Sequence, residues 1–228
     1  QQEHIDDFWG DLMEVKADPS EEYFFGSIVA IKDKTASGLL KYQLVDGQQR
    51  MATCAVLLTV IRDIYLKIGS ALVKESEKEI FNLKRTKSDE YYYKIKLDDD
   101  DNDYLKNAIF ETIDPKAMDK KDYVSKYDTQ GFATRKNLKN AYIFFHKTIW
   151  EKINLWSLKQ QEEELNDLRS ILRTNFVVAL LQVEKESKAY VLFDRLNSRG
   201  KDLALSDLVK DSILSLIDEE IKNKCNKL

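Results

Sequence analysis

The chain has 228 residues, 43% hydrophobic and 33% charged, which is enough to bury a real core in one or two domains. Its 36 basic and 40 acidic residues give a net charge of −4, which argues against a broad, non-specific nucleic-acid surface. Cys54 and Cys225 form neither a disulfide framework nor a zinc-binding spacing, so we expect a reducing, cytoplasmic setting.

The first segments predict a helix followed by two strands. Apolar residues from Ile5 to Val15 recur at helical spacing, and Asp18-Pro19-Ser20 ends that helix. The dense apolar run from Tyr23 to Ile31 predicts a core strand, and residues 33–38 form a hairpin-like connection. Residues 40–44 then alternate apolar and polar side chains, which predicts a half-buried strand.

A long buried helix is predicted next, from about Gln48 to Ile68. The run from Met51 to Ile61 is apolar apart from two threonines, so we expect this helix to be covered on most sides. That run is too short to cross a bilayer, and no signal peptide is visible, so no membrane contact is expected. Gly69-Ser70 breaks the helix, and a polar helix follows to about Leu83.

The middle of the chain predicts a strand, a helix and a loop. Alternation from Tyr91 to Leu97 favours a strand, and the acidic run from Asp98 to Asp103 is expected to cap a helix over Tyr104–Ile113. A calcium loop would need a glycine and a distal glutamate that this run lacks. Residues 114–134 are polar and predict a loop or linker.

The last part of the chain is predicted to be mainly helical. Helices are expected over Lys136–Ile153 and Leu158–Arg173, and another over Ser187–Leu196. The β-branched run from Phe176 to Val183 predicts a buried strand, with a buried helix as the alternative. Ser206 is expected to cap a final helix.

These elements predict an α+β fold. A small mixed sheet with a buried helix behind it occupies residues 1–85, and a mainly α-helical region occupies residues 86–228. We expect the two parts to pack as one compact unit and to belong to a longer protein. The sequence is also compatible with a homo-oligomer.

Several familiar chemistries lack their motifs. No glycine opens a G-x-x-x-x-G-K-[ST] loop or a G-x-G-x-x-G turn, so standard P-loop and Rossmann sites are excluded. With only His4 and His146 present, a histidine nuclease or zinc site is disfavoured, and His146 is expected to pack within a helix. Serine and cysteine hydrolase triads have no motif support.

The segment Asp46-Gly47-Gln48-Gln49-Arg50 is the first candidate site, because it joins the predicted half-buried strand to the buried helix. The helix N-terminus offers backbone N–H groups, Gly47 lets a ligand approach the backbone, and Arg50 adds a forked cation. Such a junction suits phosphate. Gln48 and Gln49 can orient a water, and Asp46 is a candidate ligand for Mg²⁺. A purely structural turn in which Asp46 pairs with Arg50 is the alternative.

The second candidate site is the segment from Phe193 to Leu203. Asn197, Arg199 and Lys201 crowd one turn around Gly200, and Lys210 projects from the helix beyond. These side chains could hold phosphate or base edges. A helix C-terminus with basic residues complementing its dipole is the structural alternative.

The two segments together resemble the GmrS-type, ParB/sulfiredoxin-like domain with its D-G-Q-Q-R motif, found in GmrSD type IV restriction proteins. The resemblance is carried by Asp46–Arg50, by the preceding Tyr23–Val29, and by a later F-x-x-x-N-x-R-G-x-x-L…D-L-x-K element. The family's middle helix resembles Asn137–Phe145. The later element is matched by Phe193, Asn197, Arg199, Gly200, Leu203, Asp207, Leu208 and Lys210.

The resemblance implies a bacterial or phage-defence protein whose D-G-Q-Q-R loop serves hydrolysis of a nucleotide triphosphate. DNA would then be cut by a separate HNH-type domain or partner. By position, Asp46–Arg50 become the catalytic loop, while Asn197, Arg199 and Gly200 become a second element that Asp207 and Lys210 support. The family's opening Q-R-x-x-x-W segment would stand before Gln1. A non-catalytic, ParB-like module that senses DNA or a partner is the second hypothesis, and a phosphodiesterase the third.

Overall fold

The computed structural model describes residues 2–33, 41–83, 91–97 and 99–184, with residues 188, 189 and 192. Its chain divides into two compact units, residues 1–26 with 48–178 and residues 27–47 with 179–228. The described elements in chain order are α1 (Gln2–Ala17), β1 (Tyr23–Asp33), β2 (Lys41–Asp46), α2 (Gln48–Lys67), α3 (Val73–Ile80), β3 (Phe81–Leu83), β4 (Tyr91–Tyr93), α4 (Asp99–Tyr104), the π-helix η1 (Leu105–Phe110), α5 (Lys120–Lys126), α6 (Ala133–Ile153), α7 (Leu158–Thr174) and β5 (Phe176–Val183).

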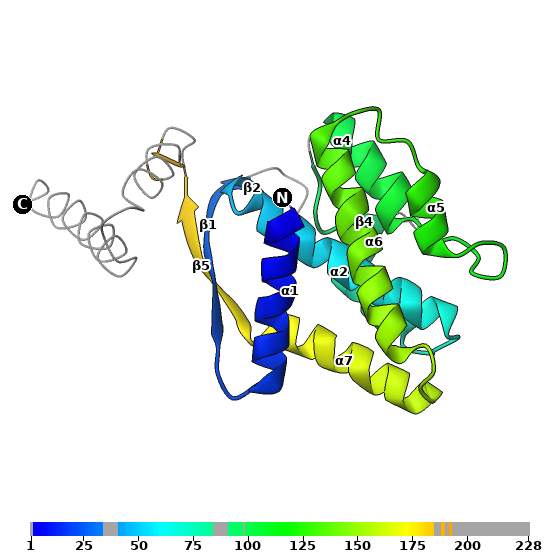
Figure 1. Ribbon diagram of the computed structural model, residues 1–228. Helices are drawn as coiled ribbons and strands as arrows, with labels where there is room; N and C mark the ends of the chain where they lie inside the picture. Colours follow the sequence, from blue (N-terminus) through cyan, green and yellow to red (C-terminus); the bar gives the residue numbers. More distant parts are fainter. Residues whose placement is uncertain are drawn as a thin grey trace, which may run out of the picture. The chain divides into compact units, whose positions relative to one another are not determined.

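Helix α2 forms the centre of the first unit, with α3, α6 and α7 packed against it (Figure 1). Its residues from Ala55 to Tyr65 are buried almost without interruption, as the apolar sequence run predicts. The apolar face of α1, which includes Phe8 and Leu12, joins the same core. One hydrophobic cluster therefore extends from α1 to α7, and burial of its apolar surface is the main stabilising contribution to this unit.

Aromatic rings fill the part of this core between α1, α6 and the first residues of β1 and β5. The ring of Phe8 lies 5.5 Å from that of Phe25, 5.9 Å from Phe145 and 5.8 Å from Phe176. Phe25 and Phe176 also meet edge to face at 5.2 Å, and the rings of Tyr23 and Phe176 pack at a tilt with their centres 4.9 Å apart. This packing fixes the start of β1 against the helices.

The three-stranded sheet has the order β2-β1-β5. β1 pairs antiparallel with β2, while β5 runs beside β1 in the same direction, so the sheet is mixed (Figure 1). The ladder pairs Val29 with Asp46 and Ala30 with Leu44, so Val45 is an extra residue in β2. A bulge of this kind bends the strand and re-aims its end. It stands directly before the first candidate site.

Most of the predicted elements are confirmed, including the helix that ends at Asp18-Pro19 and the strand predicted over 23–31, which extends to Asp33. The structure is α+β and mostly helical, with a small mixed sheet. The division into residues 1–85 and 86–228 stays a prediction. Of the described helices, none combines the length and the apolar character that crossing a bilayer demands.

Three predicted boundaries are wrong. The polar helix predicted to reach Leu83 ends at Ile80, because residues 81–83 pair with residues 91–93 as a small hairpin. The strand predicted over Tyr91–Leu97 is correspondingly limited to three residues. The predicted loop over 114–134 contains α5, whose N-cap Asp119 accepts a hydrogen bond from the backbone N–H of Lys121 at 2.9 Å.

The acidic run also behaves differently from the prediction. α4 begins at Asp99, so the aspartates form the first turns of the helix rather than a cap before it. Negative charge is favourable there because it faces the positive end of the helix dipole. Asp101 also accepts a hydrogen bond from Nε of Arg135 at 3.0 Å, which ties α4 to α6. Within the described residues, no cluster of three metal-ligating side chains is found.

β5 is a strand, as predicted, but it is only half buried. Its exposure alternates along the strand, and Val178 and Leu180 are 42% and 51% exposed. The β-branched run therefore reflects the preference of such residues for a pleated strand, not burial on both faces. Tyr42 of β2 is 40% exposed as well.

Candidate functional site

The first candidate site has the predicted strand–glycine–helix architecture. β2 ends at Asp46, Gly47 has a φ of +87°, and α2 begins at Gln48. A Cβ on Gly47 would stand 2.9 Å from Cγ1 of Ile28, which is 5% exposed on β1. Both the backbone angle and the close approach to β1 therefore require glycine at this turn.

The first turn of α2 carries the polar residues of the motif. Gln48 and Gln49 are exposed, and Arg50 is half-buried. No acidic side chain stands in this turn, so the charged group that the turn itself carries is the Arg50 guanidinium, and Asp46 lies just before it. The positive end of the helix dipole and this cation together favour an anion. The first turn of α2 therefore combines two features that favour an anion.

Arg50 is held against the start of β1. Its Nη1 donates to the carbonyl oxygen of Phe25 at 3.3 Å, and its guanidinium lies on the bare backbone of Gly26. Both partners belong to the segment 23–29 that precedes the motif by about twenty residues in the sequence. The segment is part of the family resemblance, but nothing in the sequence indicates a role for Gly26.

The second candidate element lies outside the described residues. The site residues that lie outside the described part are Asn197, Arg199, Gly200 and Lys210. The predicted helix over 187–196 also lies there, apart from residues 188, 189 and 192. The prediction that the two motifs meet in space therefore stays a prediction.

A buried polar network that sequence reasoning missed lies between α2 and α6. Arg62 and Asp63 are 0% and 5% exposed, and Oδ1 of Asp63 accepts from Nε of Arg62 at 2.8 Å. Oδ2 accepts from the hydroxyl of the fully buried Tyr142 at 2.7 Å. Burial raises the pKa of Asp63, against the charges of Arg62 and Lys120, which lower it.

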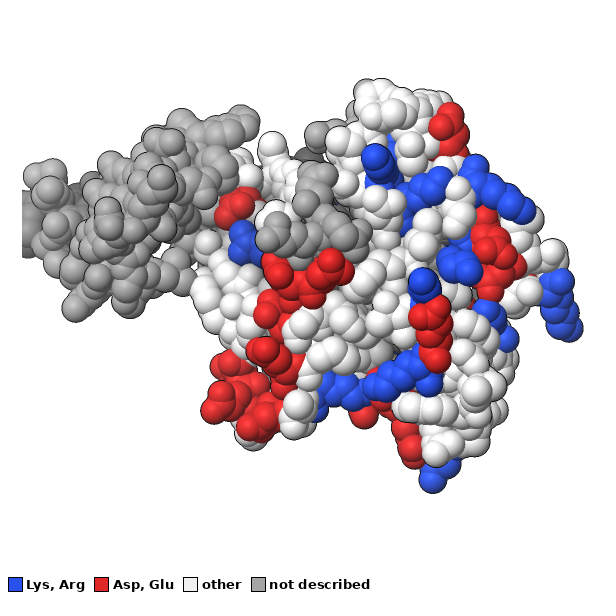
Figure 2. Space-filling view, viewed as in Figure 1, with Lys and Arg blue, Asp and Glu red and all other residues white. Residues whose placement is uncertain are grey.

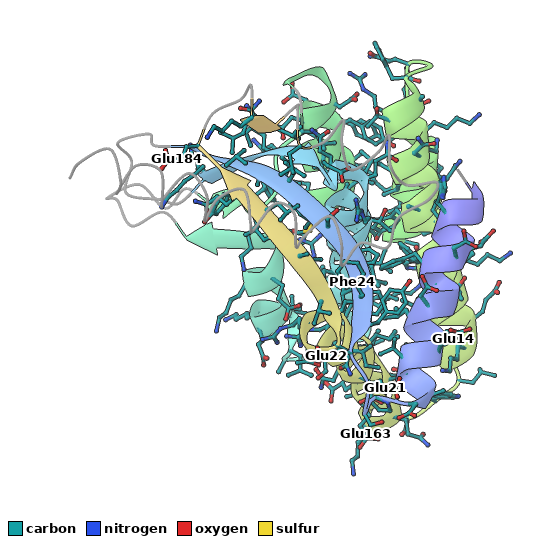
Figure 3. The ribbon with its side chains drawn as sticks, turned by 90° about the vertical axis from the view of Figure 1, so that its left-hand side faces the viewer. Glu14, Glu21, Glu22, Phe24, Glu163 and Glu184 are labelled. Atoms are coloured by element: carbon teal, nitrogen blue, oxygen red, sulfur yellow. The ribbon has the colours of Figure 1, made fainter. Side chains whose placement is uncertain are left out.

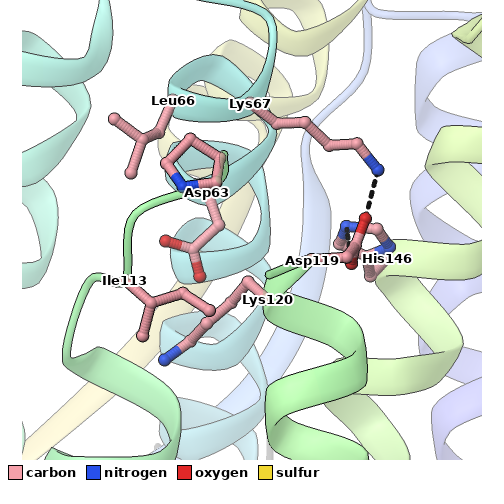
Figure 4. A pocket seen from close by; sticks show the side chains of 8 residues that line it. Asp63, Leu66, Lys67, Ile113, Asp119, Lys120 and His146 are labelled. Carbon is pink, nitrogen blue, oxygen red and sulfur yellow. Dashed lines mark hydrogen bonds and ion pairs between the residues drawn. The ribbon is translucent and has the colours of Figure 1, made fainter. Parts of the chain in front are cut away.

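A small cavity adjoins this network, between α2, α5 and α6 (Figure 4). Lys67 forms an ion pair with Asp119, and Nε2 of His146 lies 3.8 Å from the same carboxylate. Lys120 donates to the carbonyl oxygen of Glu111 at 2.5 Å, and burial lowers its pKa to about 8. Burial alone would raise the pKa of Asp119, but the hydrogen bond from Lys67 and the neighbouring charges lower it.

The size of this cavity limits its role. Its volume is about 20 Å³, which is room for roughly one water molecule. Nδ1 of His146 is buried and has no hydrogen-bond partner among the described residues, so a water is the ligand that fits. No nucleotide can enter. Lys120 is buried, and Lys67 and Asp119 are half-buried, which the sequence pattern alone does not indicate.

The surface of the first unit has a strongly acidic side. Acidic side chains gather over α1 and at its lower end in Figure 2, and α1 carries Asp6, Asp7, Asp11 and Glu14. Figure 3 shows Glu21 and Glu22 at the lower end of β1, before the exposed Phe24. Negative charge on this face is unfavourable for contact with another polyanion.

Comparison with known families decides the classification. The family model described as the GmrSD restriction endonuclease N-terminal domain matches residues 1–214. The chain belongs to this family. The match includes the strand–glycine–helix junction at 46–50 and the segment 193–203, so both motifs lie inside the GmrSD N-terminal domain. Membership places the chain among restriction or phage-defence proteins. A search of curated proteins found no match.

Proposed function

We propose that this GmrSD N-terminal domain binds a nucleotide triphosphate with Mg²⁺ and hydrolyses it at the segment Asp46–Arg50. The observation that carries the proposal is the start of α2, where a half-buried arginine is fixed beside the N-terminus of a buried helix. Family membership and the D-G-Q-Q-R motif support the same location. The one-water cavity at Asp119 is too small to compete for this role.

Each residue of the segment has a proposed task. Arg50 and the first N–H groups of α2 neutralise charge on the phosphate that is transferred. Asp46 binds Mg²⁺ or positions the attacking water, and Gln48 and Gln49 orient that water. Gly47 keeps the backbone open to the phosphate. The reaction breaks the terminal phosphoanhydride bond, and water supplies the oxygen of the released phosphate.

The second element completes the proposal. Asn197, Arg199, Gly200 and Lys210 are proposed to hold the nucleotide, with Asp207 in support. The ParB/sulfiredoxin-like character of the sheet region and a bacterial cytoplasmic location belong to the same proposal. Contact with DNA is proposed to be indirect, through an HNH-type nuclease domain or partner. This arrangement agrees with the acidic face over α1.

Phosphate release from ATP, GTP, CTP and UTP tests the proposal, measured with and without Mg²⁺. Arg50→Ala is expected to lower kcat about 100-fold or more, because it removes a group that stabilises transition-state charge. Arg50→Lys keeps the charge but loses the fork, so an intermediate rate is expected. Arg173→Ala is the matched control, because Arg173 is an exposed arginine of α7. It should leave the rate unchanged.

Equal phosphate release by wild type and Arg50→Ala would overturn the assignment of catalysis to this segment. Salt-dependent DNA binding that Arg50→Ala abolishes, without nucleotide turnover, would instead favour the DNA-sensing module. Metal-dependent nicking of plasmid DNA by this chain alone would favour the phosphodiesterase.

A further inference from the structure

The contact between Arg50 and Gly26 is closer than any side chain at position 26 permits. A Cβ on Gly26 would overlap Nη1 of Arg50 and stand 3.2 Å from its Cζ. The guanidinium therefore occupies the space that a side chain of residue 26 would fill. The φ of Gly26 is +109°, a backbone conformation that residues with a Cβ rarely adopt.

We propose that Gly26 is a positioning residue for Arg50, and that it forms with the Phe25 carbonyl a seat for the guanidinium at the start of α2. This inference rests on the proposed function for its catalytic consequence. The seat involves Phe25, Gly26 and Arg50, which belong to the same compact unit, and it can be tested without any activity.

The seat is rigid on its β1 side. The Phe25 ring packs against Phe8 at 5.5 Å and against Phe176 at 5.2 Å, so the strand that presents the Phe25 carbonyl is fixed by the aromatic core. Arg50, by contrast, has a long and flexible side chain. The position of the guanidinium therefore depends on the groups around it, because its N–H donors bind only where they meet acceptors.

An alanine at position 26 is expected to displace the guanidinium rather than to disrupt the core. The atom in its way is the far end of a flexible side chain, which can move. The remaining cost is that of a Cβ at positive φ. Gly131 provides a matched control, because its φ is +76° and a Cβ there would meet no atom within 4 Å. Gly131→Ala therefore has the backbone strain without the displacement.

The first test observes Arg50 directly. In a chain labelled with ¹⁵N-arginine, the Nε–Hε signal of Arg50 is assigned by its loss in Arg50→Lys. Gly26→Ala is expected to move this signal, and Gly131→Ala is expected to leave it in place. An Arg50 signal that stays unchanged in folded Gly26→Ala would overturn the seat.

A double variant covers the case in which Gly26→Ala does not fold. Gly26→Ala/Arg50→Ala removes the clash and leaves only the strain. If the double variant folds where Gly26→Ala does not, the clash with Arg50 is the cause and the seat is supported. If neither folds, the backbone alone requires glycine, and the proposal is wrong.

Turnover then tests the catalytic consequence. Gly26→Ala is expected to lower kcat about 10- to 100-fold, because displacing a catalytic group by about 1 Å can cost two orders of magnitude. In the Arg50→Ala background the same substitution should cause no further loss, since both changes remove one function. A wild-type chain without turnover would refute the proposed function, while the NMR and folding results would still decide whether Gly26 seats Arg50.

Discussion

The buried pair of Arg62 and Asp63 allows a quantitative prediction. In Arg62→Met the methionine fills much of the space of the arginine stem but carries no charge. Asp63 then keeps the hydrogen bond from Tyr142 and loses both contacts at 2.8 Å that Arg62 makes with Oδ1. A buried carboxylate without its cation is among the most destabilising local changes in a protein.

The expected loss at pH 7 is about 3 kcal/mol of unfolding free energy. Breaking a buried ion pair costs roughly 3–5 kcal/mol. The lower end applies here because the positive charge of Lys120 also acts on Asp63. This loss is a large fraction of the roughly 5–15 kcal/mol that stabilises a typical domain.

The loss should depend on pH with a definite sign. Burial already raises the pKa of Asp63 above its reference value of 3.8, and Arg62→Met removes the charge that limits this rise. Above pH 3.8 and up to the raised pKa, the folded variant binds more protons than the unfolded chain. The stability of the variant therefore falls as pH rises through this window, and it falls further than that of the wild type, whose Asp63 pKa is raised less, so the penalty of Arg62→Met grows with pH above 3.8.

Urea unfolding followed by tryptophan fluorescence measures both effects, because Trp9, Trp150 and Trp156 all lie in the first compact unit. The double variant Arg62→Met/Asp63→Asn removes the stranded charge and should be more stable than Arg62→Met at pH 7. Arg173→Met is the control for an exposed arginine. A double variant that is less stable than Arg62→Met, or a penalty that does not grow as pH rises from about 4 to 7, would contradict the prediction.

Two further predictions concern His146 and Ser157. Burial, helped by the charges of Lys67 and Lys121, lowers the pKa of His146 to about 4, although Asp119 opposes this shift. The NMR signals of His146, assigned with His4→Ala, should titrate near pH 4. Between pH 4 and pH 6.5 the folded state binds fewer protons than the unfolded chain, so the unfolding free energy should fall as pH falls. His146→Gln should remove this pH dependence. Ser157→Ala deletes the capping box of α7 and should lower the unfolding free energy by about 1 kcal/mol, measured by urea unfolding. Ser170→Ala, on the exposed face of the same helix, should not destabilise the protein. Equal effects of the two substitutions would contradict the capping role.

The sequence predicts the long elements well because each has a dense period and a strong stop signal. α1 ends before Pro19, α2 begins after Gly47 and ends before Gly69, and α7 follows a serine cap. At these positions local preference and tertiary packing favour the same structure. The strand–glycine–helix junction was predictable for the same reason.

The bounds of the short elements were predicted less well, because a strand pairing or a cap decides them rather than a long period of apolar residues. β3 and β4 have three residues each and exist by pairing with one another across residues 84–90. α5 has seven residues, and its position follows from the cap at Asp119 rather than from a long period. β-structure of this length depends on its partner more than on its own residues.

The polar residues of α2 show what a motif search misses. Arg62 and Asp63 lie in a helix rich in apolar residues, and an adjacent pair of opposite charges is ordinarily a solvent-exposed feature. Their burial follows from Tyr142 on α6, 79 residues later. Equally, nothing near Arg50 in the sequence indicates that Gly26 would lie beneath its guanidinium.

The buried residues in the second half of α2 help to position the proposed site at its first turn. The proposed catalytic groups stand on the first turn of the helix, and a site keeps its geometry only when the element that carries it is held. α2 is held over its second half by continuous burial and by the hydrogen bond from Tyr142 to Asp63. At its first turn it is held by the contact of Arg50 with Phe25 and Gly26. This suggests why the core beside α2 contains polar side chains. A directed hydrogen bond fixes the rotation of α2 about its axis, whereas packing of similar apolar side chains specifies that rotation less sharply.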